Sequence, residues 1–165
     1  MSTASAPAGR TAETAETAET AKTGRTGRTV KVAAREAVPN SRRGGEIRVT
    51  LSPKTVGSTS GFGGVMTLGA GEHVTEHYHP YSEEFLHVIS GSLEMTLDGE
   101  TVPLTAGDSL FVPIGVRHRL VNTGKETARC AFHLSPLAPR PDLGHVDTEE
   151  PQQPGGANPD VGGAP

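Results

Sequence analysis

Short apolar runs separated by turn residues occupy the middle of the chain, between about residues 29 and 148. Within these runs apolar and polar positions alternate, which is typical of half-buried β-strands. The strongest turn signal is Asp98-Gly99, a dipeptide that favours two-residue hairpins. Short strands in this number favour a closed or double-sheet all-β fold. The predicted strands are residues 47–51, 62–68, 73–79, 84–90, 93–97, 110–113, 118–122 and 128–134.

The two ends of the chain lack such a pattern. Residues 1–28 repeat Ala-Glu-Thr and then Thr-Gly-Arg, and residues 149–165 are rich in Pro, Gly, Gln and Asn. Segments with so few apolar residues cannot offset the entropy cost of ordering, so we predict disordered tails at 1–28 and 149–165 around one domain at 29–148. A helix that the N-terminal repeat forms on a partner is the less favoured alternative, because the repeat is rich in threonine and has no cap.

Composition supports a β domain and narrows the range of partners. The 165 residues include 21 glycines and 13 prolines, which is too many for a helical bundle. A net charge of −4 and a pI near 6.0 provide no basic surface, so we expect no nucleic acid and no membrane as partners. Cys130 is the single cysteine, which excludes an internal disulfide, and no apolar run suits a signal peptide or a membrane span. We therefore expect a soluble, cytoplasmic protein.

Three histidines and a glutamate form a candidate metal site. His77 and His79 are two residues apart on one predicted strand, so their side chains leave the same face. Glu84 begins the next strand, where antiparallel pairing brings it opposite this pair, and His118 begins a later strand after a tight turn. Such ligands suit a divalent first-row metal and leave octahedral positions open for water or substrate. The alternative is that these histidines are hydrogen-bonded core residues, because the His-X-His pair alone also occurs by chance.

The spacing around these residues resembles the two sequence motifs of the cupin superfamily. The first motif is carried by Gly71, His77, His79, Glu84 and Gly91, and the second by Gly107, Pro113, Gly115, His118 and Asn122. The stretch between the motifs, residues 92–106, is short, as in microbial single-domain cupins. The resemblance implies a double-stranded β-helix, a small jelly-roll barrel, with the metal held inside near one mouth.

The two-residue period of β-strands then sorts the neighbouring side chains. If the four candidate ligands point into the barrel, the other side chains expected inside are those of His73, Thr75, Leu86, Val88, Val116 and Leu120. Phe85, His87 and Ile89 are expected outside. Glu83, the competing carboxylate, is expected to be solvated or to support a ligand rather than to bind the metal.

Three further histidines are candidates for other roles. His133 lies on the last predicted strand, whose orientation the sequence does not fix. It is the candidate catalytic acid or base if it lines the cavity, and a structural hydrogen-bonded residue if it does not. The same alternatives hold for His73. His145 lies in a Pro-rich exit segment and is expected to be exposed.

Three longer segments resemble a narrower group, the small cupins of actinobacterial aromatic (type II) polyketide clusters. These segments are residues 39–45, 77–85 and 132–141, and the likeness runs from about residue 38 to residue 148. The group includes spore-pigment cupins and cyclases of the tetracenomycin and resistomycin type. The resemblance implies a metal-dependent polyketide cyclase that catalyses the aldol-type cyclisation of a poly-β-ketone.

The same resemblance bears on cofactor and partners. Zinc is the favoured divalent metal ion because cyclisation needs no redox change, and iron, manganese and nickel are the alternatives. The expected partners are an aromatic polyketide intermediate, the polyketide synthase, and a second copy of the chain, with Val74, Phe85 and Ile89 on the buried face of a homodimer. Two other functions stay open, an Fe(II)-dependent oxygenase and a non-catalytic accessory protein of the synthase.

Overall fold

Two antiparallel β-sheets make up the computed structural model, which describes residues 30–162. The predicted tail at residues 1–28 lies outside the described residues. One sheet has the strand order β1-β2-β3-β10-β5-β8, and the other has the order β11-β4-β9-β6-β7. The strands are β1 (Pro39–Asn40), β2 (Glu46–Leu51), β3 (Phe62–Leu68), β4 (His73–Tyr78), β5 (Glu83–Ser90), β6 (Ser92–Leu97), β7 (Glu100–Thr105), β8 (Ser109–Val112), β9 (His118–Asn122), β10 (Ala128–Ser135) and β11 (Val146–Asp147). Short helical turns occur at η1 (Ala34–Glu36), α1 (Pro53–Val56) and η2 (Pro141–Leu143).

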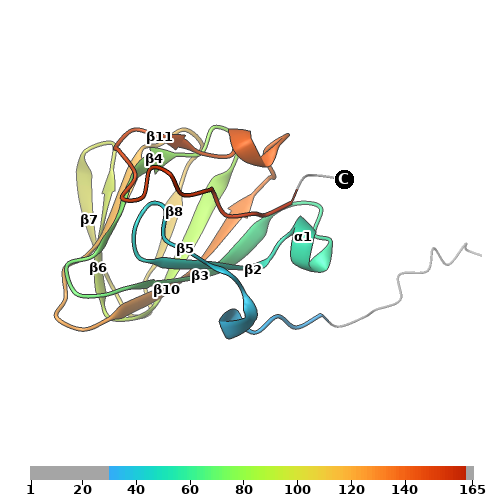
Figure 1. The fold of residues 1–165 in the computed structure, drawn as a ribbon. Coiled ribbons are helices and arrows are strands. Elements are labelled where there is room, and N and C mark those ends of the chain that lie inside the picture. Colours follow the sequence, from blue (N-terminus) through green and yellow to red (C-terminus); the bar gives the residue numbers. More distant parts are fainter. Residues whose placement is uncertain (1–29, 163–165) are drawn as a thin grey trace, which may run out of the picture.

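The two sheets enclose one hydrophobic core between them (Figure 1). Both sheets contribute to it, for example through Leu86 and Val88 of β5 and through Met95 and Leu120 of β6 and β9. This confirms the predicted jelly-roll architecture and all eight predicted strands. Among residues 30–162, no helix is long and apolar enough to span a membrane.

Three further strands were not predicted from the sequence: the two-residue strands β1 and β11, and the longer strand β7. Strand β7 contains Pro103, which pairs with Glu94 of β6, and it lies at the edge of its sheet. An edge strand tolerates a residue that has no N–H to donate, whereas a proline inside a sequence run argues against a central strand. Pro103 therefore explains why the sequence pattern did not predict β7.

The predicted alternation holds along β5 and fails along β4. In β5, Glu84, Leu86 and Val88 are buried and Phe85, His87 and Ile89 are exposed, which confirms the prediction. In β4 the pairing with β9 shifts between Val74 and His77, which marks a β-bulge. The two-residue period does not continue through a bulge.

Two predictions about β4 are wrong because of this bulge. Val74, expected on an outer dimer face, is buried in the core and pairs with Leu120. His73, expected inside the barrel, instead contacts the side chain of Gln152 through its Nε2 at 3.1 Å. Thr75 is buried as expected.

Residues 144–162 form a C-terminal strap that runs along the barrel to the side where α1 lies (Figure 1). Its backbone is tied at several points, because Thr148 N donates to Glu76 O at 3.0 Å and Gln153 N donates to Arg42 O at 3.0 Å. Near its end, Val161 is buried and accepts a hydrogen bond from Lys54 N. The disordered tail predicted at 149–165 therefore differs from the structure over residues 149–162. Polar contacts with the barrel order this segment in place of an apolar stripe of its own.

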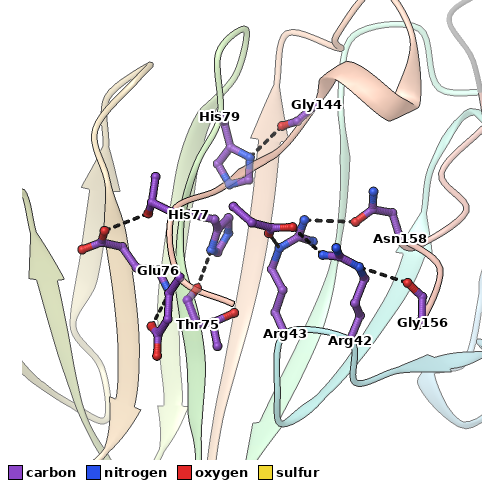
Figure 2. Close-up of polar contacts among 12 residues, drawn as sticks. Arg42, Arg43, Thr75, Glu76, His77, His79, Gly144, Gly156 and Asn158 are labelled. Carbon is purple, nitrogen blue, oxygen red and sulfur yellow. Dashed lines mark hydrogen bonds and ion pairs between the residues drawn. The ribbon is translucent and has the colours of Figure 1, made fainter. Parts of the chain in front are cut away.

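A pair of arginines after β1 holds the C-terminal strap at Asp147. Arg42 Nη1 and Arg43 Nε each donate to a different oxygen of that carboxylate, both at 2.6 Å. Figure 2 shows the two side chains extending side by side, with further hydrogen bonds from Arg42 to the Gly156 carbonyl and from Arg43 to the Asn158 side chain. Charged hydrogen bonds that are partly shielded from water are among the stronger contacts in a protein.

The turn that carries these arginines requires glycine at the next position. Gly44 has φ +104°, a left-handed conformation, and a Cβ there would lie 2.1 Å from the His73 carbonyl oxygen. Any other residue would collide with the β4 backbone. Gly44 thus lets the arginine pair approach β4 and the C-terminal strap closely.

We expect Asp147→Asn to lower the free energy of unfolding by about 2 kcal/mol at neutral pH, because both arginines lose a charged hydrogen bond. Burial raises the pKa of the Asp147 carboxyl, but the hydrogen bonds from Arg42 and Arg43 outweigh it, so the pKa lies below its ordinary value of 3.8. The stabilisation is therefore present above about pH 4 and is lost as the pH falls through the lower pKa of the folded state.

Urea denaturation of both proteins at about pH 7 and about pH 3 measures this difference. The gap between wild type and variant should shrink at the lower pH. Asp142→Asn is the matched control, since its ion pair with Arg140 is exposed and should contribute almost nothing. The expectation would be contradicted if wild type and Asp147→Asn had the same free energy of unfolding at pH 7, or if their difference were equal at both pH values.

Candidate metal centre

The four predicted ligands lie together on the inner side of the barrel. His77 belongs to β4, His79 follows the end of β4, Glu84 belongs to β5 and His118 begins β9. The bulge in β4 leaves His77 directly paired with His118 across the sheet. All four side chains are buried, with exposed fractions between 3% and 7%.

The three imidazoles are within reach of a single ion, and the Glu84 carboxylate lies beside two of them. One ring nitrogen of each of His77, His79 and His118 lies within 4.8 Å of the others. Glu84 Oε2 lies 3.2 Å from His79 Nε2 and 3.1 Å from His118 Nε2. The predicted convergence of the four side chains is thus present in the geometry.

Backbone carbonyls orient all three imidazole rings. The Nδ1 atom of His77 is 2.8 Å from Thr75 O, that of His79 is 2.9 Å from Gly144 O, and that of His118 is 2.9 Å from Val116 O. The first two contacts are drawn in Figure 2. A carbonyl only accepts, so each Nδ1 carries the hydrogen and each neutral ring keeps its lone pair on Nε2. This is the arrangement in which proteins present histidine to a metal.

The facing acceptors require a cation between them. The lone pairs on Nε2 of His79 and His118 face a carboxylate oxygen of Glu84, and His118 Nε2 is buried with no well-aligned hydrogen bond among the described residues. Acceptors that face one another repel unless a proton or a metal ion lies between them. The buried donor set of three nitrogens and one carboxylate oxygen fits a divalent first-row metal ion.

The pKa values of Glu84 and the neighbouring histidines also indicate that a cation is favoured at this site. Burial raises the pKa of Glu84, but His118 and His79 outweigh it when their Nε2 atoms are protonated, and they hold the pKa well below its usual value. Burial lowers the pKa of His118, but Glu84 favours the protonated ring and reverses the direction, so the net shift is upward. His77 has a pKa well below its ordinary value because of burial and the two neighbouring imidazoles. Positive charge is therefore favoured next to Glu84.

His145 was not identified as a site residue from the sequence. It was expected to be exposed, but its ring packs against His79 with centroids 4.6 Å apart and against His77 with centroids 5.9 Å apart. Its Nδ1 is buried and has no hydrogen bond among the described residues. The C-terminal strap carries it there, and no periodic pattern in that segment could have indicated the contact.

His133 is not positioned for the predicted catalytic role. Along β10 the buried residues Cys130, Phe132 and Leu134 alternate with exposed ones, and His133 is exposed. Its Cα partner is Phe85, an outward residue of β5. The structure therefore places His133 on the outer face of the sheet, away from the candidate ligands.

A cavity with a free volume of about 50 Å³ lies beside the imidazoles. Its wall consists mainly of apolar side chains from both sheets, such as Phe62, Met95 and Leu120. The polar side chains that line it are those of Arg43, His77, His79, Glu84, His118 and His145. Glu83, the competing carboxylate, is not among the lining residues. The space suits an ion with a few waters.

The chain is similar to one protein family and to several named proteins. The sequence model of the family described as "Cupin domain" matches residues 64–134, a span that contains all four candidate ligands. The chain is 58% identical over 120 residues to "Polyketide synthase CurC" of Streptomyces cyaneus, which covers 73% of this chain and 78% of that protein. It is 51% identical over 133 residues to "Tetracenomycin polyketide synthase protein TcmJ" of Streptomyces glaucescens, covering 81% of this chain and 89% of that protein.

A solved structure supports the fold. A conserved protein from Klebsiella pneumoniae, described as having a double-stranded beta-helix domain, superposes with a TM-score of 0.59. The match covers 74% of this chain and 99% of that chain, at 23% sequence identity. At this identity the likeness concerns the fold alone.

We expect chelator-treated protein to bind one divalent ion per chain, measured by titration calorimetry with Zn²⁺. Glu84→Gln should weaken binding by more than about tenfold, the smallest effect typical of residues that merely support a ligand. His133→Ala is the control and should bind like wild type, because its side chain is on the outer face. Equal affinity of Glu84→Gln and wild type would remove the carboxylate from the ligand set.

Proposed function

The chain belongs to the cupin family, and we propose that it is a metal-dependent cyclase that catalyses the aldol-type ring closure of a poly-β-ketone in polyketide biosynthesis. The observation that carries the proposal is the buried cluster of three oriented imidazoles and one carboxylate beside an apolar cavity. Relatives with 58% and 51% identity are polyketide synthase proteins by name, which supports the substrate class.

His77, His79, Glu84 and His118 would hold the metal, with zinc as the favoured ion. Bound there, a divalent ion would supply a Lewis acid that polarises carbonyl oxygens of a β-dicarbonyl unit and stabilises the negative charge that develops on them. The carbonyls of Thr75, Val116 and Gly144 keep the rings in the orientation for binding. The fixed geometry avoids a reorganisation cost during the reaction.

The apolar wall of the cavity has two tasks in this reaction. It excludes water from a reactive poly-β-ketone, and it folds the chain so that one carbonyl carbon meets the correct nucleophilic carbon. The free volume of about 50 Å³ is smaller than a polyketide, so binding requires part of the wall to move. The C-terminal strap, which contributes His145 and Pro159 to the lining, is held to the barrel largely by polar contacts and is the part suited to move.

We expect Glu84→Gln and His118→Ala to lower formation of the correctly cyclised product by about 100-fold or more, the loss typical when a charge-stabilising group is removed from an active site. The measurement is the product profile, by liquid chromatography and mass spectrometry, of a host that expresses the polyketide synthase together with each variant. His133→Ala serves as the control and should leave the profile unchanged.

Two results would overturn the cyclase proposal. Unchanged products with folded Glu84→Gln and His118→Ala proteins would indicate a non-catalytic accessory protein. Iron in the purified protein, together with turnover that stops without dissolved oxygen, would indicate an oxygenase. Metal analysis of protein purified without chelator therefore accompanies the product profile.

The outer face of β5 and β8 supports the proposal of a homodimer. Phe85, Ile89 and Phe111 are exposed there at 45% to 46%, and the rings of Phe85 and Phe111 lie 5.3 Å apart. Large apolar side chains that gather on one face typically mark an interface. A second copy is the occupant that suits a flat sheet face of this kind.

Sedimentation velocity at micromolar concentration should show a dimer for wild type and a monomer for Phe85→Ser combined with Phe111→Ser. The aromatic pair supplies the apolar area that such an interface buries. Ile114→Ser, which removes an equally exposed apolar side chain on a turn, should remain a dimer. A monomeric wild type would contradict the proposal.

A further inference from the structure

Arg43 is a buried arginine in the wall of the cavity. Its exposed fraction is 4%, and it lines the same space as His77, His79 and His145. Among the described residues that line this cavity, it is the one with a permanently charged cationic side chain. A permanent charge in a largely apolar wall needs an electrostatic partner.

The partners of Arg43 satisfy only part of its guanidinium. Nε donates to Asp147 Oδ1 at 2.6 Å, and Nη2 donates to Asn158 Oδ1 at 3.0 Å. Within residues 30–162 no hydrogen bond is found for Nη1. The group therefore keeps donor capacity for an acceptor that comes from outside these contacts.

The charge around Asp147 is also unbalanced. Its single carboxylate is shared between Arg43 and Arg42, with one ion pair of 2.6 Å to each. Two guanidinium groups against one carboxylate leave one positive charge in excess. At a buried location such an excess attracts an anion more strongly than it would in water.

A second polar atom in the same cavity also lacks a partner. Nδ1 of His145 is buried without a hydrogen bond among the described residues. His145 and Arg43 line the same cavity. A buried polar atom without a partner is unfavourable by about 1–3 kcal/mol, so His145 Nδ1 indicates a polar ligand beside Arg43.

We propose that Arg43 is a substrate-binding residue that holds an anionic oxygen of the polyketide, either an enolate or a carboxylate oxygen. The identity of this ligand rests on the proposed function, whereas the recognition of an anion rests on Arg43 itself. With the imidazole cluster as one attachment point and Arg43 as another, a chain of repeating β-ketone units is fixed in one direction along the cavity. Such orientation is what ring closure at one specific carbon requires.

Arg42 supplies a matched control for this proposal. Both arginines donate to Asp147 and to a second group of the C-terminal strap, Gly156 O for Arg42 and Asn158 for Arg43. Only Arg43 lines the cavity. Arg42→Met and Arg43→Met therefore both weaken the attachment of the C-terminal strap at Asp147, but only Arg43→Met changes the wall of the cavity.

The experiment measures the dissociation constants of three probes of similar size by titration. The probes are 1-phenylbutane-1,3-dione, used above its own pKa as an enolate, 4-phenylbutanoate as a carboxylate, and 1-phenylbutan-1-one as a neutral ketone. The readout is the preference for each anion over the neutral ketone, because that ratio cancels changes in access to the cavity. Each protein is measured as purified and after chelator treatment, with circular dichroism as the test of folding.

Arg43→Met should lower the preference for at least one anion by about tenfold to a hundredfold, the effect of losing one charged hydrogen bond. Arg42→Met should leave it within about twofold. Whether the enolate or the carboxylate loses affinity identifies which oxygen Arg43 binds. Equal preferences in the two variants, or no loss for either anion, would overturn the proposal. The role of Arg43 would then be limited to holding the C-terminal strap.

Two further arms keep the test decisive. If Arg43→Met does not fold, Arg43→Lys and Arg42→Lys replace the pair. The first should then lower the preference by about threefold or more, because lysine keeps the charge but loses the planar fork, and equal preferences would again overturn the proposal. The chelator-treated arm separates this proposal from that of a metal-dependent cyclase. A protein that fails to bind metal would still show the contribution of Arg43 to the preference for an anion.

Discussion

The buried carboxylate of Glu84, with imidazole nitrogens 3.1 and 3.2 Å away, is the interaction on which the rest of the structure depends. An uncompensated anion inside an apolar barrel is strongly unfavourable. A proton or metal ion between the carboxylate and the facing imidazoles of His79 and His118 would offset this charge, and a backbone carbonyl fixes each of the three rings. Neighbouring strands lie at a fixed spacing, so residues at or near their ends can hold these groups close together, which is why the barrel suits the site.

The second organising contact is the clamp between the arginine pair and Asp147. It joins the loop after β1 to the C-terminal strap, two segments more than 100 residues apart in sequence. Arg43 lines the cavity and also holds the C-terminal strap, so the charge of the cavity wall and the position of the strap depend on one side chain.

The convergence of the four candidate ligands and the barrel could be predicted because both depend on short-range regularities. His-X-His on a strand and the turn glycines follow from local geometry, and the inward parity of Glu84 follows from the buried positions Leu86 and Val88. The orientation of His133 was also available in principle, since Phe132 and Leu134 alternate around it on β10.

The remaining features depend on contacts distant in sequence. The bulge that turns Val74 inward and His73 outward has no marker in the local pattern. The C-terminal strap is ordered by hydrogen bonds to the barrel rather than by apolar residues of its own, which is why its composition suggested disorder. The contact of half-buried His145 with the imidazoles follows only once the strap is in place.

The carbonyl of Gly144, which orients His79, lies ten residues beyond the last residue matched by the family sequence model, Leu134. A protein shortened after β10 would keep every motif residue and still lose the partner of one ring, together with His145 and the anchors of Arg43. Motif searches across genomes would score such a protein as intact. Homologues are therefore better compared over the whole length to residue 162 than over the motif span, when the aim is to transfer a biochemical role from one to another.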